Sequence, residues 1–331
     1  MSDTYHDAIL LWQCRDKGDK MGASQHVWVR SRGVNLSVEV SMPPDKPDAP
    51  TVVLVHGYPD NAEVWRPIRE HLSKEFVVVT YDCRGAGQSS KPNATRGYAL
   101  ARFVDDLVAV TDLVSPQQPF HLVGHDWGSV HSWESVTEER LKGRIASFTS
   151  ISGPCLDHLS LWMRSKITHP KPRNLWLLAR QFLASLYVLF FQLPWLPEWS
   201  WKMGYKGFWP KWFKWTEGID AQPDATQLAD AQNGLGMYRA NVLKAMIRPR
   251  IRMAHAPVQI VVPTNDRYVR PFLAEAAVPF VTVLWRRDVA DTHWVIRKRP
   301  ELIASYIREF IEWVDADAAP QLPLRMVGGR R

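Results

Sequence analysis

Short runs of apolar, mostly β-branched residues recur along this 331-residue chain, and their recurrence restricts its fold more than any other feature. The run Thr51 to Val55 has no polar alternation, which is typical of a strand buried on both faces of a parallel sheet. Helical patterns separate most of the runs, as at Ala101 to Leu113 and Pro300 to Val314. This alternation predicts an α/β fold with a mostly parallel sheet between layers of helices. Further strands are expected at Phe76 to Thr80, His121 to Gly124, Ile145 to Ile151, Val258 to Val262 and Val281 to Trp285.

The alternation stops between about Gly153 and Ile251, where Trp, Lys, Phe and Pro become frequent. We expect a mostly helical insertion there, followed by a return to the sheet. A hairpin is expected around Arg32-Gly33. The predicted organisation is an arm at 1–24, an α/β core formed by 25–153 and 252–316, a helical insertion at 154–251 and a loose tail at 317–331.

The composition favours a cytoplasmic protein without a metal or nucleic-acid partner. Cys14, Cys83 and Cys155 have no CxxC spacing, which argues against a disulfide framework and against a zinc site. The net charge of +7 comes without a block of Lys and Arg in a nucleic-acid-binding motif. Asp3 and Asp7 stand where a secretory signal would be positive, so secretion is not expected.

One apolar segment, Leu175 to Leu193, is long enough to span a bilayer. Arg180 and Gln181 lie in its first half and Gln192 near its end, however, and a charge within a membrane span is rare and costly. The segment is therefore interpreted as a buried or interfacial helix, which leaves peripheral contact with a membrane open.

The strongest chemical signal is Gly124-His125-Asp126-Trp127-Gly128, between a predicted strand and a helical stretch. Two glycines around a central polar residue allow a sharp strand-to-helix turn, the nucleophile elbow of α/β-hydrolases. The central residue here is Asp126, and a carboxylate can attack carbon directly and leave an ester on the enzyme. The alternative is an aspartate that only caps the following helix, but a cap does not need both glycines.

Two further segments complete this chemistry. His56-Gly57-Tyr58-Pro59 directly follows the first buried strand, and in this fold that loop supplies one oxyanion-hole N–H while the residue after the nucleophile supplies the other. This predicts an oxyanion hole from the backbone N–H groups of Tyr58 and Trp127. Asp266 and His293 each follow a late strand, in the order nucleophile, acid, histidine that the fold uses. Asp157 is the alternative acid.

These motifs resemble the epoxide hydrolase and haloalkane dehalogenase branch of the α/β-hydrolases, which implies an α/β-hydrolase fold with a helical cap over the active site. The turn around Asp82 and Arg84 belongs to the same resemblance, and both residues are expected to hold that turn rather than contact a substrate. The resemblance extends from about Val27 to Val314 and rests on Gly124 to Gly128, His56 to Pro59, Asp82 to Ser89, Asp266 and His293.

Within this branch, the chain is most similar to the epoxide hydrolases. Haloalkane dehalogenases usually carry Asn at the position of Tyr58, and fluoroacetate dehalogenases usually carry Arg at the position of Trp127. Epoxide hydrolases use two cap tyrosines to donate to the opening ring, and the segments around Tyr187 and Tyr238 are similar to those that carry them. The alternative for both tyrosines is simple packing within the cap.

The resemblance implies an epoxide hydrolase that needs no cofactor and converts a lipophilic epoxide and water into a vicinal diol. In the implied mechanism Asp126 attacks the epoxide, Tyr187 and Tyr238 donate to its oxygen, and His293, oriented by Asp266, activates water. The alternatives are a haloalkane dehalogenase with the same triad and a non-catalytic binding protein, which would not need the Asp–Asp–His set. A homodimer is left open, as is continuation into the second, dehydrogenase-like domain that some bacterial relatives carry.

Overall fold

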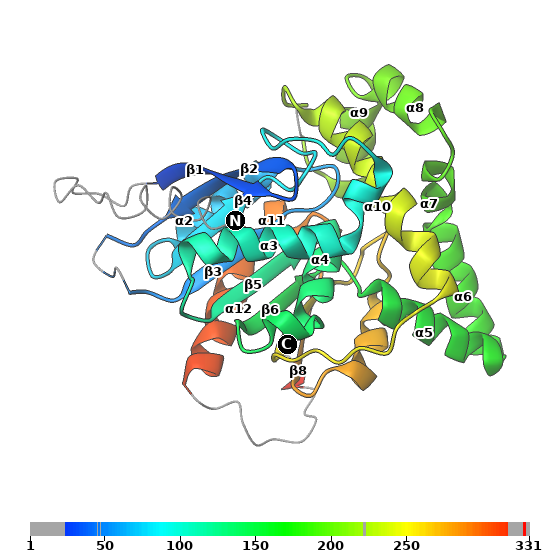
Figure 1. The fold of residues 1–331 in the computed structure, drawn as a ribbon. Helices are drawn as coiled ribbons and strands as arrows, with labels where there is room; N and C mark the ends of the chain where they lie inside the picture. The colour runs from blue at the N-terminus through cyan, green and yellow to red at the C-terminus, as the bar shows by residue number, and fades with distance from the viewer. Residues whose placement is uncertain (1–23, 45, 47, 221–222, 317–326, 329–331) are drawn as a thin grey trace.

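A single mixed sheet forms the centre of the computed structural model, which describes residues 24–44, 46, 48–220, 223–316 and 327–328 (Figure 1). Its strand order is β1-β2-β4-β3-β5-β6-β7-β8-β9. The strands from β4 to β8 pair in parallel, whereas β2 pairs antiparallel with both β1 and β4. The strands are β1 (Ser24–Ser31), β2 (Val34–Ser41), β3 (Thr51–Val55), β4 (Val77–Tyr81), β5 (Phe120–His125), β6 (Ile145–Ile151), β7 (Val258–Pro263), β8 (Leu284–Val289) and β9 (Val327–Gly328).

Helices cover both faces of the sheet, which explains the continuous apolar runs. In β3, Val53 and Val55 face one hydrophobic core, while Val52 and Leu54 face the other, and all four are at most 1% exposed. One core is closed by α3 (Leu100–Val114) and α4 (Trp127–Val136), and the other by α2 (Arg66–Leu72), α11 (Val295–Lys298) and α12 (Pro300–Asp315). A strand buried on both faces needs no polar alternation, and the four residues that follow Thr51 in β3 are all apolar. The described residues also form the 3₁₀ helices η1 (Ala62–Trp65), η2 (Thr95–Tyr98), η3 (Glu139–Leu141) and η4 (Pro271–Phe280).

Between β6 and β7 the chain leaves the sheet and forms a group of helices on one side of the molecule (Figure 1). We refer to this group, residues 156–247, as the helical insertion. In Figure 1, α6, α7 and α8 are its outermost helices, and the sheet lies on the opposite side of the molecule. The helices are α5 (Leu156–Thr168), α6 (Pro172–Ala184), α7 (Leu186–Phe191), α8 (Leu196–Gly204), α9 (Phe208–Glu217) and α10 (Gln227–Ile247).

An ion cluster joins the two connections of the insertion to α4. Arg250, just after the insertion, bonds Glu134 of α4 (2.8 Å) and Asp157 at the start of α5 (2.8 Å). Arg252 adds a second contact to Glu134 at 2.6 Å. Burial alone would raise the pKa of Glu134, but the two arginines lower it below its ordinary value. Asp157, the alternative triad acid, is therefore paired with Arg250, and it is Asp266 that contacts His293.

Two sequence expectations were wrong in detail. The last long strand was expected at Val281 to Trp285, but β8 is Leu284–Val289, because a strand beside the short β9 needs no continuous apolar run and carries charged residues at its centre. The segment Leu175 to Leu193 is not one helix, since α6 ends at Ala184 and α7 begins at Leu186. Its outer side chains, including Leu175, are exposed, which agrees with the interfacial alternative and not with the buried one.

The predicted termini fall largely outside the described residues. Of the arm at 1–24 only Ser24 is described, and it begins β1 rather than ending an arm. Of the tail at 317–331, Val327–Gly328 pairs with β8, so these two residues are ordered as a strand. The boundaries of core and insertion stay predictions.

A buried ion pair fixes the loop after β4, as was expected for Arg84. The Arg84 guanidinium donates to both carboxylate oxygens of Asp106 in α3, at 2.7 and 2.5 Å, and the two side chains are 1% and 0% exposed. The same guanidinium also donates to the carbonyls of Gly97 and Arg102. Asp82 accepts from the N–H groups of Ala62 and Gln88, so both residues hold the turn.

Replacing Asp106 by Ala should lower the free energy of unfolding by roughly 3–5 kcal/mol, because it leaves a buried guanidinium without its counter-charge. The neighbouring Asp105→Ala variant is the control. Asp105 pairs with the exposed Arg32 and Arg140 side chains, so its loss should cost about 0–1 kcal/mol. Urea denaturation of both variants measures the difference, and equal losses would contradict this account of Arg84.

Candidate active site

Asp126 occupies a strained strand-to-helix turn between β5 and α4, with φ at 52°. A Cβ at Gly128 would collide with the carbonyl oxygen of Val55, and a Cβ at Gly124 would collide with Gly128 and the start of α4. The two glycines therefore let the turn pack directly against β3. A positive φ is costly for a residue with a side chain, and such strain is concentrated at functional sites.

The three predicted triad residues come together at the carboxyl ends of the strands, although they are far apart in sequence. The imidazole of His293 lies between two carboxylates, with Nδ1 2.8 Å from Oδ2 of Asp266 and Nε2 3.4 Å from Oδ2 of Asp126. Asp266 is fully buried, and its other oxygen accepts from the N–H groups of Tyr268 (2.8 Å) and Val269 (2.9 Å). Since Asp266 holds Nδ1–H, Nε2 is the nitrogen that faces Asp126.

The charges around His293 favour its protonated form. Burial alone would lower the pKa of His293, but the carboxylates of Asp266 and Asp126 raise it well above its ordinary value. Next to it, burial and the charge of His293 together lower the pKa of His125 to about 4. Neutral His125 uses Nε2 to contact the carbonyl oxygen of His293 at 3.0 Å, so it supports the position of His293.

Of the two predicted oxyanion-hole groups, one contacts the Asp126 carboxylate and the other begins the helix that follows it. The backbone N–H of Tyr58 donates to Oδ1 of Asp126 at 2.7 Å. Trp127 is the first residue of α4, where backbone N–H groups have no partner within the helix. A Cβ at Gly57 would lie 2.5 Å from Oδ1 of Asp126, so this position must be glycine for the loop to approach the carboxylate. The Tyr58 hydroxyl donates to the carbonyl of Ala231 in α10 (3.0 Å) and ties the loop to the insertion.

A cavity of about 510 Å³ lies between the insertion and the ends of the strands, and Asp126 and His293 line it. Tyr187 from α7 and Tyr238 from α10 line the same cavity, with ring centroids 6.0 Å apart. Burial raises the pKa of both tyrosines, and the nearby Asp126 carboxylate raises it further. The remaining wall is mostly aromatic and includes Phe191, Trp201, Trp209, Trp212, Tyr268 and Trp294.

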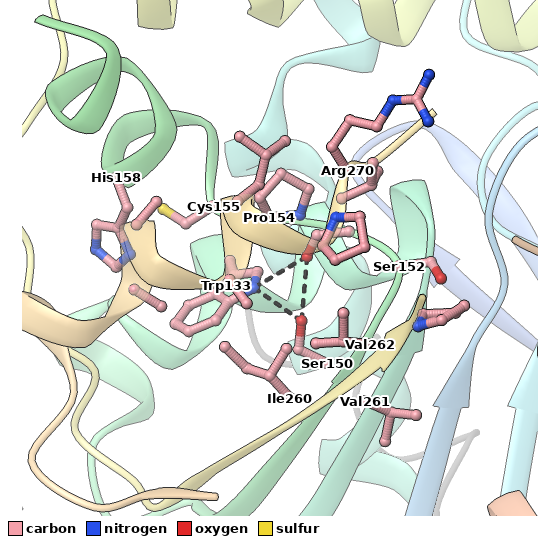
Figure 2. A pocket seen from close by; sticks show the side chains of 18 residues that line it. Trp133, Ser150, Ser152, Pro154, Cys155, His158, Ile260, Val261, Val262 and Arg270 are labelled. Carbon is pink, nitrogen blue, oxygen red and sulfur yellow. Dashed lines mark hydrogen bonds between the residues drawn. The ribbon is translucent and has the colours of Figure 1, made fainter. Parts of the chain in front are cut away.

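A second cavity, of about 220 Å³, also reaches Asp126, Tyr187 and Tyr238. Figure 2 shows a third and much smaller space, of about 40 Å³, between β6, β7 and η4. There Trp133 Nε1 donates to Ser150 Oγ and to the carbonyl of Gly153, both at 3.1 Å. None of the predicted catalytic residues lines this space, and we interpret it as a packing void.

Sequence analysis did not single out Tyr268. Its ring lies 5.0 Å from the His293 ring and 5.8 Å from the Tyr187 ring, so it separates the histidine from the insertion. Its position two residues after Asp266, in the same loop, is the sequence feature that could have predicted a place near the triad. Within the described residues, no group of three or more His, Cys, Asp or Glu side chains is placed to hold a metal ion.

This combination of sheet, elbow and strand-end triad defines an α/β hydrolase. Residues 50–277 match the family model of the alpha/beta hydrolase fold, and the chain belongs to that family.

The chain is 33% identical over 299 residues to the probable oxidoreductase EphD of Mycobacterium tuberculosis, a match that covers 86% of this chain and 49% of that protein. It therefore spans about half the length of this relative. Epoxide hydrolase A of Mycobacterium tuberculosis is 36% identical over 137 residues, which are 41% of each protein. The solved epoxide hydrolase of Bacillus megaterium has the same fold, with a TM-score of 0.70 at 19% identity over 86% of this chain and 100% of that chain.

Replacing Asp126 by Asn should lower the pKa of His293, because it removes one of the two carboxylate charges that raise this pKa. An NMR titration of the histidine rings measures the change, with the signal assigned by its loss in His293→Gln. The control is Asp220→Asn, which alters an exposed carboxylate paired with Lys214. Equal pKa values for His293 in Asp126→Asn and the wild type would contradict the coupling.

Proposed function

We propose that this protein is an epoxide hydrolase that converts a lipophilic epoxide into a vicinal diol through an ester on Asp126. The observation that carries the proposal is the pair Tyr187 and Tyr238, which line the same cavity as Asp126. An opening epoxide leaves an alkoxide, a poor leaving group unless it receives a hydrogen bond as it forms. The relatives named as epoxide hydrolases support the same reaction.

In the first step, Oδ2 of Asp126 attacks the less hindered epoxide carbon. This assignment of the two oxygens is supported by the hydrogen bond from the Tyr58 N–H to Oδ1, which makes Oδ1 the carbonyl oxygen of the resulting ester. The carbon–oxygen bond of the ring breaks, and Tyr187 and Tyr238 donate to the alkoxide. Their raised pKa values support this role, since each hydroxyl keeps its proton at neutral pH.

In the second step, His293 removes a proton from water, and the resulting hydroxide attacks the carbonyl carbon of the ester. Formation of the ester removes the charge of Asp126 and with it one cause of the raised pKa of His293. The imidazole of His293 therefore loses its proton more readily once the ester has formed, and its neutral form can take a proton from water. The N–H groups of Tyr58 and Trp127 stabilise the tetrahedral oxyanion, and the diol leaves after receiving a proton from His293.

The helical insertion is proposed to act as a cap that selects the substrate. It contributes both tyrosines and most of the aromatic wall of the 510 Å³ cavity. A wall of this composition favours an apolar substrate body, because burying apolar surface is the main source of affinity in such a site. The tyrosine pair also separates this proposal from haloalkane dehalogenation, since a halide leaves without a proton.

The test of the proposed function is turnover of a panel of aryl and long-chain alkyl epoxides and bromoalkanes by the purified protein. We expect diol formation from the epoxides and no halide release. Halide release without diol formation would overturn the proposal in favour of a dehalogenase, and turnover of neither class would overturn it altogether.

His293→Gln should form the ester but fail to hydrolyse it, because attack by a carboxylate needs no base whereas activation of water does. Intact-protein mass spectrometry after mixing with epoxide should therefore show an added mass equal to that of the substrate. Asp126→Ala should show neither adduct nor turnover. An adduct that persists in the Asp126→Ala protein would place the nucleophile elsewhere.

Tyr187→Phe and Tyr238→Phe should each slow ester formation by on the order of tenfold to a thousandfold, because each removes one donor to the developing alkoxide. Rapid-quench kinetics separates formation of the ester from its hydrolysis, which should change little. Tyr205→Phe, in the insertion but outside both cavities, is the matched control. A double Tyr187/Tyr238 variant that formed the ester at the wild-type rate would reduce the two tyrosines to packing residues.

A further inference from the structure

The large apolar side chains exposed on this protein are concentrated in one region. Of the twenty that are exposed among the described residues, all but Trp28 lie between Ile167 and Met253. Soluble proteins commonly expose single apolar residues, whereas many of them on one group of helices mark an interaction surface. We call the exposed side of α6, α7, α8 and α9 the outer face; in Figure 1, α6 to α8 are the outermost helices of the molecule.

Helix α6 carries apolar side chains on its outer side as well as on its inner side. Leu175, Trp176, Phe182 and Leu183 follow a helical spacing and are 52%, 54%, 55% and 66% exposed. The inward side carries the buried Leu177 and the buried Gln181, whose amide donates to the carbonyl of Tyr268 at 3.2 Å. A helix that packs only against its own protein places its apolar stripe inward, so the stripe of α6 is available to another apolar phase.

The next helices continue this pattern. Trp199 and Met203 of α8 are 58% and 68% exposed, and Phe208 and Trp215 of α9 are 66% and 68% exposed. Tryptophan at such positions is typical of proteins that contact the interface between headgroups and acyl chains, because its ring is apolar with one polar edge.

Basic side chains accompany the apolar ones on the outer face. From Lys166 to Trp215 the sequence contains eight Lys or Arg residues and one acidic residue, Glu198. The charge of Glu198 is already paired with Arg239 of α10. Arg180 lies over the Trp176 ring at 4.6 Å, so a cation and an aromatic ring are presented together. A surface of exposed tryptophan and leucine with an excess of basic side chains is complementary to anionic lipid.

The cavities that reach Asp126 extend to this face. The exposed Leu183, Phe208 and Trp212 line the 510 Å³ cavity, and the exposed Phe182 and Leu189 line the 220 Å³ cavity. A ligand held against the outer face is therefore beside the entrances to the candidate active site.

We propose that the outer face docks on an anionic lipid bilayer, with the apolar side chains of α6 to α9 in the interfacial region and the basic ones at the headgroups. Docking would be peripheral, since none of the described helices has the length and the apolar composition that a membrane span requires. A second copy of the chain fits this face less well, because a symmetric contact would bring its lysines together. If the proposed function holds, docking places the cavity entrances where a lipophilic epoxide is dissolved.

Sedimentation with vesicles tests the proposal without relying on catalysis. The protein should bind vesicles of phosphatidylcholine mixed with phosphatidylglycerol, bind pure phosphatidylcholine much more weakly, and lose binding as salt is raised. Asp126→Ala should bind as the wild type does, so failure of the proposed enzymatic function would not affect this result.

Paired variants identify the face. Leu175→Gln with Trp176→Gln, which line neither cavity, should weaken vesicle binding by on the order of tenfold to a hundredfold. The control is Trp28→Gln. Trp28 on β1 is 54% exposed, as Trp176 is, but it lies outside the outer face, so this variant should bind vesicles as the wild type does.

Charge variants complete the test. Lys206→Gln with Lys211→Gln should weaken binding to anionic vesicles by roughly thirtyfold, at about fivefold per charge. The exposed Lys91→Gln with Lys142→Gln carries the same loss of charge on the core and should have little effect. No binding to anionic vesicles, or equal effects of the two charge pairs, would overturn the proposal. A dimer in light scattering that dissociates in the Leu175/Trp176 variant, without vesicle binding, would instead make the outer face a self-association surface.

Discussion

The close approach of three backbone segments around Asp126 is the constraint on which the rest of the site depends. Side chains are absent at Gly57, Gly124, Gly128 and Gly153, and a Cβ at any of them would collide with the elbow or with the strand beside it. This approach brings the Tyr58 N–H to 2.7 Å from the carboxylate while His293 faces its other oxygen. The strain of the turn is sustained because β3, β5 and β6 hold it from both sides.

Charge balance gives the site its second property. Asp266 accepts three hydrogen bonds, which fix the orientation of its carboxylate. Its contact with Nδ1 in turn fixes the ring position and the tautomer of His293. The pKa of His293 depends on two carboxylates, and only the charge of Asp126 is lost when the proposed ester forms. Under the proposed mechanism, ester formation on Asp126 therefore lowers the pKa of His293 before the second step begins.

Features determined by local sequence could be predicted, and those determined by tertiary packing could not. The elbow, the oxyanion loop and the order of the triad follow from glycine spacing and strand ends, which are local, and the structure brings those residues together. The position of β8 could not be found from apolar runs, because its place beside the short β9 permits Arg286 and Asp288. Tyr268 was missed because its contact with His293 exists only in the folded protein. The break at Ser185 between α6 and α7 has no Gly or Pro to mark it.

The ion cluster at the base of the insertion ties this base to the elbow, whereas the outer helices of the insertion are not part of it. Both connections to the sheet pass through Arg250, Arg252 and Asp157, and these are bonded to Glu134 on the helix that begins at the elbow. Residues farther out on α6 to α9 contact neither this cluster nor Asp266. Mutation can therefore remodel the walls of the cavity, and with them the range of compounds accepted, while the elbow and triad keep their geometry. Under the proposed function, the residues that select the substrate can therefore change while the residues that carry out the reaction stay the same.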